Sequence, residues 1–173
     1  MSGAGRVLLV GMMGAGKTTI GRLLAERLGG RHLDSDLQVE ARTGKTVPQI
    51  FSESGEAAFR TEESKALADA LAQPTPVVVS VAGGAVLDPA NRELIRGAGR
   101  VVWLRACPET LARRVGSGAG RPLLEHDPAG SLARLDAVRR PLYDELAGLV
   151  VDVDDASAEE VVDRIQAWLE EPA

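Results

Sequence analysis

The residues best suited to chemistry lie in segment 11–18, which reads GMMGAGKT. A buried strand is expected before it and an amphipathic helix after it, which is the context of a phosphate-binding loop. Its glycines let the main chain curl around phosphates with the N–H groups pointing inward. Lys17 would reach the β- and γ-phosphates, and the Thr18 hydroxyl would ligate Mg²⁺. A ligand-free turn needs no such lysine and hydroxyl, so the segment predicts a nucleoside triphosphate site.

Two carboxylates, Asp34 and Asp36, follow the second expected strand and flank a single residue. Open α/β sheets bind ligands at the carboxyl ends of their strands, and in strand geometry the two side chains share a face. One could hold the water shell of a metal ion while the other meets an acceptor hydroxyl. The alternative is a solvated turn in which Asp36 caps the next helix, but the nearby glycine loop favours the functional interpretation.

Arginines occur in three further segments. Residues 113–124 combine glycines with three arginines, which predicts a mobile lid that brings an arginine onto phosphate, with a plain surface loop as the alternative. Adjacent Arg139 and Arg140 point about 100° apart on a helix, so at most one is expected to face a site, and Pro141 is expected to break that helix. Arg60 and Glu63 are better interpreted, from sequence alone, as an exposed helical ion pair.

Alternating strands and helices must position these side chains. Strand-like runs occur at 7–10, 31–33, 77–81, 101–104 and 149–153, with helical stretches between them. This alternation predicts an α/β domain with a parallel sheet. The third run leads into Gly83 and Gly84, which allow either close approach to a ligand or a tight turn. No repeat or linker interrupts the pattern, so we expect one domain over residues 1–173.

The composition narrows the class of protein. With 173 residues, of which 45% are hydrophobic and 26% charged, one globular domain is expected. A net charge of −5 argues against nucleic acid, and no apolar run approaches the roughly 20 residues that span a bilayer. The early first strand leaves no room for a signal peptide, and the single Cys107 suits a reducing compartment, so a cytoplasmic location is expected.

Together these motifs resemble the shikimate kinase family, and the resemblance covers almost the whole chain. The glycine loop alone specifies only a large superfamily. The resemblance also rests on five further segments, which are DSD at 34–36, FRTEE at 59–63, GGAV at 83–86, RPLL at 121–124 and RRPLY at 139–143. The aspartate pair, the Phe-Arg pair and the final Arg-x-Pro-Leu-Tyr are the parts specific to this family.

The resemblance implies a three-layer P-loop NTPase fold, with a five-stranded parallel sheet flanked by helices. The acceptor-binding segment would be about 34–63, and a mobile lid would span about 114–126. It also implies transfer of the γ-phosphate of ATP, with Mg²⁺, to the 3-hydroxyl of shikimate, in the biosynthesis of chorismate and aromatic amino acids. The expected partner is this small molecule, with no nucleic acid and no membrane, and the expected state is a monomer.

The resemblance further assigns a role to each candidate residue. Lys17 and Arg121 would hold the transferring phosphate, and Asp36 would bind the acceptor hydroxyls and is the candidate base. The shikimate carboxylate would lie between Arg60 and Arg139, and Glu63 would orient Arg60. The backbone at Gly83 and Gly84 would approach the substrate. The pocket walls would be Phe51 and Phe59. The implied nucleotide-binding set is Gly14, Ala15, Gly16, Lys17, Thr18, Thr19, Arg114 and Arg121, with Arg114 against adenine, and the implied metal ligands are Thr18 and, through water, Asp34.

The chain departs from the family pattern at Ala82, where three consecutive glycines are usual. If that position needed a positive φ, alanine would strain the acceptor site; we expect the change to be tolerated. The loop 154–157 lacks the arginine and proline of some relatives, so base contacts there are expected from the main chain.

Three other functions fit part of the pattern. A gluconate kinase would also use a hydroxylated carboxylate, and only the order of the motifs argues against it. A nucleoside monophosphate kinase would need arginines for a second phosphate. A nucleotide-binding module without catalysis would be the remaining case, although every residue expected for chemistry is present.

Overall fold

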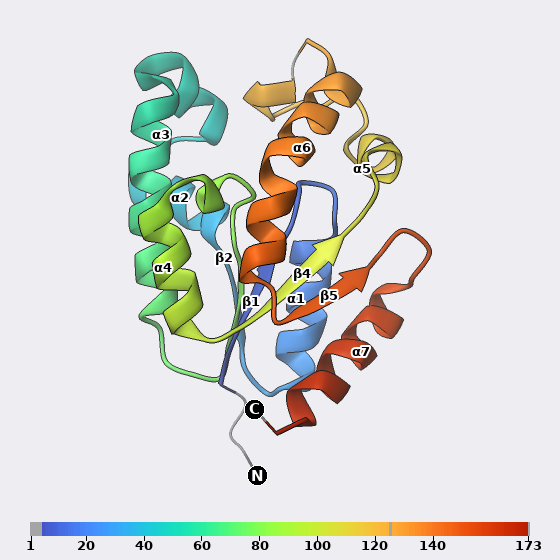
Figure 1. Ribbon diagram of the computed structural model, residues 1–173. Helices are drawn as coiled ribbons and strands as arrows, with labels where there is room; N and C mark the ends of the chain where they lie inside the picture. The colour runs from blue at the N-terminus through green and yellow to red at the C-terminus, as the bar shows by residue number, and fades with distance from the viewer. Residues whose placement is uncertain (1–4, 125, 173) are drawn as a thin grey trace.

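The computed structural model describes residues 5–124 and 126–172 as a five-stranded parallel sheet between two layers of helices (Figure 1). The ends of the predicted 1–173 domain and residue 125 of the predicted lid lie outside the described residues. The strands are β1 (Arg6–Val10), β2 (Arg31–Asp34), β3 (Val77–Ser80), β4 (Arg100–Arg105) and β5 (Leu149–Asp152). The helices are α1 (Lys17–Arg27), α2 (Ser35–Thr43), α3 (Val47–Leu71), α4 (Pro89–Ala98), α5 (Pro108–Val115), α6 (Pro128–Leu146) and α7 (Ala158–Glu170), with short 3₁₀ turns η1 (Ala85–Leu87) and η2 (Pro122–Leu124).

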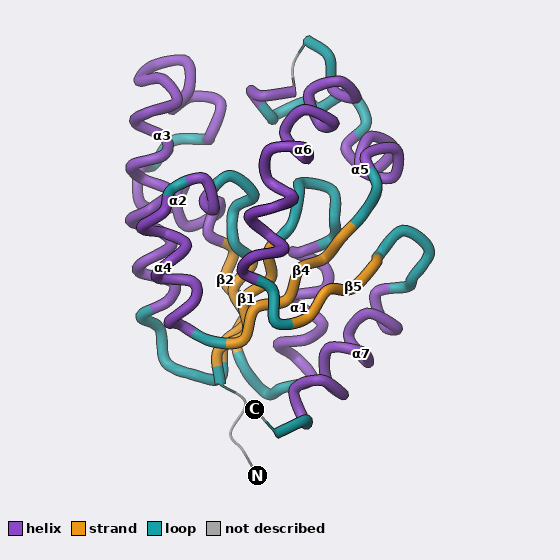
Figure 2. Tube along the Cα trace, in the orientation of Figure 1, coloured by secondary structure: helices purple, strands orange, loops and turns teal. Residues whose placement is uncertain are grey.

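The strands lie in the order β2-β3-β1-β4-β5, and all four neighbouring pairs are parallel. Helices α1 and α7 pack together against one face, while α3, α4 and α6 cover the other (Figure 2). The central strands are buried almost throughout, as both faces of a covered parallel sheet must be. This architecture confirms the predicted α/β fold with a five-stranded parallel sheet.

Parallel strands bring their carboxyl ends to one edge of the sheet. Asp34 at the end of β2 pairs with Ser80 at the end of β3, and Ser80 pairs with Leu9 near the end of β1. The glycine loop, the aspartate pair and the segment with Gly83 and Gly84 therefore leave the sheet side by side. This edge is where open α/β sheets place their ligands.

The prediction that Pro141 breaks a helix is wrong, because α6 continues through it to Leu146. A proline removes one helical hydrogen bond, here the one to the carbonyl of Ala137. Both Pro141 and Ala137 are exposed, so this side of the helix faces solvent, where water can satisfy the freed carbonyl. Burial of Tyr143 and Leu146 in the core holds the turns that follow the proline.

No helix within residues 5–124 and 126–172 combines the length and the apolar character that a membrane crossing requires.

Candidate active site

The glycine loop connects β1 to α1 and places Lys17 at the first helical position. Gly14 and Gly16 have φ angles of 85° and 96°, a left-handed conformation that favours glycine. The Lys17 Nζ atom donates hydrogen bonds to the carbonyl oxygens of Gly11 at 2.7 Å and Met12 at 3.0 Å. Burial lowers the pKa of Lys17 to about 8, against the opposing effect of nearby carboxylates. The loop thus presents a cation and a helix N-terminus to the same edge.

Asp34 ends β2 and also caps α2. Its Oδ1 atom accepts hydrogen bonds from the N–H groups of Asp36 at 3.0 Å and Leu37 at 3.3 Å, while Oδ2 accepts from the Thr18 hydroxyl at 2.8 Å. The expectation that both aspartates share a strand face is therefore wrong, because Asp36 lies in the first turn of α2. The capping residue is Asp34 rather than Asp36. The Asp34 carboxylate thus caps a helix and also contacts the glycine loop, so the two alternatives from the sequence, a capping role and a role in the site, both apply to it.

The Asp36 side chain lines the cavity described below, together with Asp34. Although the residue is exposed to that cavity, the surrounding protein removes enough solvent to raise the pKa of its carboxyl. The negative charge of Asp34 raises the pKa further, while Lys17 and Arg60 lower it. Loss of solvent outweighs the two cations, so the proton affinity of Asp36 is higher than that of a free aspartate.

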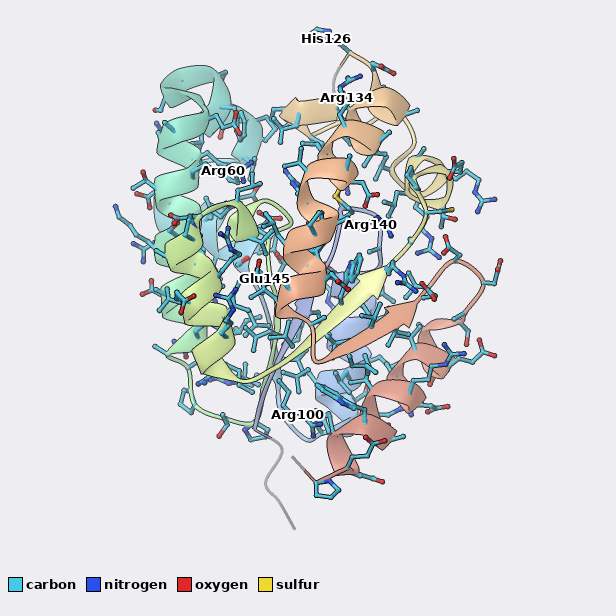
Figure 3. The ribbon with its side chains drawn as sticks, in the orientation of Figure 1. Arg60, Arg100, His126, Arg134, Arg140 and Glu145 are labelled. Carbon is cyan, nitrogen blue, oxygen red and sulfur yellow. The ribbon has the colours of Figure 1, made fainter. Side chains whose placement is uncertain are left out.

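Arg60 and Glu63 contradict the expectation of an exposed pair, because the Glu63 side chain is only 2% exposed. Arg60 Nη1 donates to both Glu63 carboxylate oxygens, at 2.9 and 3.0 Å. Burial raises the pKa of Glu63 to about 7, while the Arg60 charge lowers it. The reason is tertiary: this face of α3 turns inward over Gly84. Figure 3 shows Arg60 between α3 and α6.

Gly84 makes room for that guanidinium. Its φ of −89° would suit any residue, yet a Cβ atom there would lie 2.1 Å from Arg60 Nη1. The sequence offered ligand approach or a tight turn as reasons for this glycine. The structure gives a third, which is space for an arginine of the same protein.

Arg139 on α6 is 1% exposed, and its Nε and Nη1 atoms have no hydrogen-bond partner among the described residues. A Cβ atom at Gly83 would lie 3.1 Å from Arg139 Nη1, and the Tyr143 hydroxyl donates to the Gly83 carbonyl at 2.7 Å. Arg140 instead turns away to Asp136 at 3.0 Å (Figure 3). This confirms that only one of the adjacent arginines faces the site. The sequence motif at 139–143 includes Tyr143 but gave it no role, although its spacing of four from Arg139 places it on the same helix face.

These side chains surround one cavity of about 560 Å³ at the carboxyl edge of the sheet. A kink at Gly55, with φ 84° and ψ 173°, divides α3 so that Phe51 and Phe59 pack with ring centroids 4.9 Å apart on the cavity wall. The sequence did not single out Glu40 and Ser80, which also border it. The predicted residues that line it are Gly14, Gly16, Lys17, Thr18, Thr19, Asp34, Asp36, Phe51, Phe59, Arg60, Glu63, Gly83, Gly84, Arg121 and Arg139.

The predicted lid contributes Arg121 to the cavity from the loop between α5 and η2. Gly116, Gly118 and Gly120 in this loop all have positive φ, and Leu124 anchors its far end in the core. The mobility of the lid stays a prediction.

Two predicted nucleotide residues do not line the cavity. Arg114 donates instead to the carbonyl oxygens of Gly14 at 3.3 Å and Val153 at 2.8 Å, so it ties the glycine loop to the end of β5. Ala15 is buried in the core, and its N–H donates to the Met12 carbonyl at 3.1 Å. Contact of Arg114 with adenine stays a prediction.

Ala82 is compatible with the site. Its φ is not positive, and its N–H donates to the buried Ser35 hydroxyl at 2.8 Å. The strain that a missing glycine could have caused is therefore absent at this residue.

Comparison with known proteins agrees with this geometry. A family model described as shikimate kinase matches residues 13–170. Shikimate kinases of Burkholderia lata and Symbiobacterium thermophilum are 45% and 47% identical to the chain, each match covering 95% of it and 89% and 96% of the relative.

Solved structures are similar too. One described as shikimate kinase from Acinetobacter baumannii in complex with shikimate superposes with a TM-score of 0.92 and 38% identity, over 95% of this chain and 92% of the other. A gluconokinase from Sinorhizobium meliloti, with a TM-score of 0.65 and 20% identity, shares only the fold. The site built from Lys17, the aspartate pair and two inward arginines thus lies in a chain that belongs to the shikimate kinase family, and the chain is an ATP-dependent kinase.

Proposed function

We propose that the chain transfers the γ-phosphate of ATP to the 3-hydroxyl of shikimate, a step in the biosynthesis of chorismate and aromatic amino acids. The observation that carries the proposal is the buried Arg139 guanidinium, whose Nε and Nη1 atoms have no partner among the described residues. A buried charge is costly unless it is paired, so this group favours an anionic ligand. Arg60 lines the same cavity, and two guanidinium groups suit one carboxylate.

The acceptor hydroxyl belongs near Asp36, which lines the same cavity. In this proposal Asp36 accepts a hydrogen bond from the 3-hydroxyl and directs its oxygen toward the phosphate. Its raised pKa, with Lys17 nearby, makes it a better proton acceptor than a free aspartate. Phosphoryl transfer has a loose transition state, so orientation of the hydroxyl is expected to matter more than removal of its proton.

The phosphate end is supplied by the glycine loop and the lid. The N-terminus of α1 offers unpaired N–H groups and the positive end of its dipole to an anion. Lys17 and Arg121 are the two cations of this end that line the cavity. Charge on the transferring phosphate would be stabilised by the helix N-terminus and Lys17, and by Arg121 once the lid has closed.

Mg²⁺ is part of the proposal, and the donor set fits it. The Thr18 hydroxyl and Asp34 Oδ2 are hard oxygen ligands 2.8 Å apart at the edge of the cavity. Thr18 would bind the ion directly and Asp34 through water. When bound, the ion would neutralise charge on the nucleotide phosphates.

The remaining parts of the proposal concern the setting of the reaction. One chain carries cations, carboxylates and glycine loop around a single cavity, so we propose that the enzyme works as a monomer in the cytoplasm. Residues 114–126 would act as a lid, with Arg114 near the base and Arg121 carried onto the phosphates as it closes.

A coupled ADP-release assay with Mg·ATP tests the proposal, with shikimate, gluconate, a nucleoside monophosphate or no acceptor. Turnover is expected with shikimate alone. Arg139→Ala and Arg60→Ala should raise the KM for shikimate at least tenfold and leave the KM for ATP within about twofold. Arg140→Ala is the matched control, because its side chain pairs outside the cavity with Asp136. Bound ADP without shikimate-dependent turnover would contradict the proposed substrate.

A further inference from the structure

A short chain of hydrogen bonds lies beneath the first turn of α1. The Ser80 hydroxyl donates to the Lys17 carbonyl oxygen at 2.9 Å, and His32 Nε2 lies 2.8 Å from Ser80 Oγ. A carbonyl oxygen only accepts, so the single Ser80 proton is used there. Ser80 Oγ must then accept from His32, which places a proton on the Nε2 atom of the imidazole.

This chain ends on the peptide group that joins Lys17 to Thr18. Because a peptide is planar and trans, its C=O and N–H point in opposite directions. A hydroxyl that fixes the Lys17 carbonyl therefore also fixes the direction of the Thr18 N–H. The first intrahelical bond after the loop runs from Ile20 N–H to the Gly16 carbonyl, so the Thr18 N–H is among the free donors of the helix start. These are the donors that a phosphate would meet.

The same strand holds this peptide from a second direction. His32 and Asp34 are two residues apart on β2, so they lie on one face of the strand. Asp34 accepts the hydrogen bond from the Thr18 hydroxyl at 2.8 Å, while His32 reaches the preceding carbonyl through Ser80. Strand β2 thus fixes both the side chain and the main chain at the start of α1.

Gly21 supplies independent support for this arrangement. It lies in the middle of α1, where glycine is unfavourable compared with alanine. A Cβ atom there would lie 2.6 Å from both His32 Cδ2 and His32 Nε2, and 2.9 Å from Ser80 Oγ. Glycine at position 21 therefore leaves room for the His32 and Ser80 side chains.

We propose that His32 and Ser80 are positioning residues for nucleotide binding, acting through the Lys17 carbonyl on the free donors of α1. The inference rests on the proposed function, since it concerns the same phosphate end. Ser80 borders the cavity, but His32 does not line it and acts only through Ser80. Removal of the imidazole N–H should therefore weaken nucleotide binding without a direct change in the site.

The test measures the dissociation constant of Mg·ADP by calorimetry for the wild type, His32→Phe, His32→Gln and Ser80→Ala. Loss of the hydrogen bond in His32→Phe and Ser80→Ala should raise this constant about threefold to tenfold. The amide N–H of His32→Gln can reach the position of imidazole Nε2 and should restore binding to within about twofold of the wild type. Unfolding in urea reports any general loss of stability in each variant.

Two further results decide the inference. The double variant His32→Phe/Ser80→Ala should bind Mg·ADP no more weakly than Ser80→Ala alone, because both changes interrupt the same series of hydrogen bonds. The KM for shikimate should stay within about twofold throughout. Three results would overturn the inference. The first is unchanged ADP affinity in His32→Phe, and the second is equal weakening of ADP binding in His32→Phe and His32→Gln. The third is a parallel loss of affinity for shikimate and ADP.

The experiment also separates the inference from the proposed function. Calorimetry with Mg·ADP needs no turnover, so it decides the role of His32 even if shikimate is not phosphorylated. If His32→Phe fails to fold, Ser80→Ala and His32→Gln still give the comparison, with unchanged ADP affinity in Ser80→Ala as the refuting result.

Discussion

Gly84→Ala should impair binding of the acceptor without straining the main chain. The backbone at Gly84 has φ −89° and ψ −6°, which alanine adopts readily, so no strain arises in the main chain. The new Cβ atom would lie 2.1 Å from Arg60 Nη1. That atom is at the end of a flexible side chain, which can move aside but gives up its hydrogen bonds to the buried Glu63 carboxylate. The Arg60 guanidinium must then leave its place.

The size of the effect follows from the contacts that Arg60 would lose. An ordinary carbon–nitrogen contact of about 3.5 Å requires a shift of roughly 1.4 Å, which exceeds what the Glu63 hydrogen bonds at 2.9 and 3.0 Å can tolerate. A misplaced guanidinium loses a charge-assisted hydrogen bond to the substrate carboxylate, worth about 1.5–3 kcal/mol. The dissociation constant for shikimate should therefore rise about 10- to 150-fold.

The assay compares shikimate and ATP constants for the wild type, Gly84→Ala and Gly97→Ala. Gly97 lies in α4, and a Cβ atom at this position would have nothing within 4 Å. Gly97→Ala should therefore keep wild-type kinetics and gain about 0.5–1 kcal/mol of stability. The KM for ATP should change by less than about twofold in both variants. A Gly84→Ala enzyme with a wild-type KM for shikimate would refute the idea that this glycine positions Arg60.

Two further predictions concern Lys17 and Ala82. The pKa of Lys17, lowered to about 8, means that the cation is present below this pH and lost above it, so kcat/KM for ATP should fall between pH 8 and 10. Saturating ATP brings phosphates that favour the charged form, so kcat should fall less; equal declines of both parameters would argue against this assignment. Ala82→Gly should leave the KM for shikimate within about twofold and lower the free energy of unfolding in urea by about 0.5–1 kcal/mol. A tighter KM for shikimate in this variant would show that alanine crowds the acceptor.

The fold could be predicted because its signals are local and repeated. Strands buried on both faces must be apolar over their whole length, and the valine-rich runs around residues 77–80 and 101–104 have this property. The end of β2 was less clear, because Asp34 is both the last residue of the strand and the cap of α2, and only the structure shows where the strand stops. The prediction of a helix break at Pro141 was wrong for a related reason. The sequence does not show that this side of α6 faces solvent, which allows the helix to continue through the proline.

Part of the active site could likewise be predicted from local sequence, and part could not. Lys17 and Thr18 follow from one contiguous motif whose geometry is set by the loop itself. Arg60 and Glu63 do not, because an i, i+3 pair on a helix has the same spacing whether it faces solvent or a cavity. What decides the outcome is the packing of α3 against the segment after β3, which joins residues distant in sequence. The family resemblance supplied this placement, whereas the bare residue pattern favoured the exposed alternative.

The glycines show most clearly where local reasoning ends. Gly14 and Gly16 are required by their own positive φ, a property of the loop that contains them. Gly21, Gly83 and Gly84 are required by side chains from other elements, namely His32, Arg139 and Arg60. In each of these three cases the neighbour is a charged or hydrogen-bonding side chain of the active site or its support. Although Gly30 and Gly99, which precede β2 and β4, face main-chain carbonyl oxygens, Gly83 and Gly84 at the carboxyl edge of the sheet mark the places of polar side chains from elsewhere in the chain. Substitution of either glycine should affect binding of the acceptor more than stability. The flexible arginine side chain can move away from the new Cβ atom, but it then leaves the position that it needs to contact the substrate.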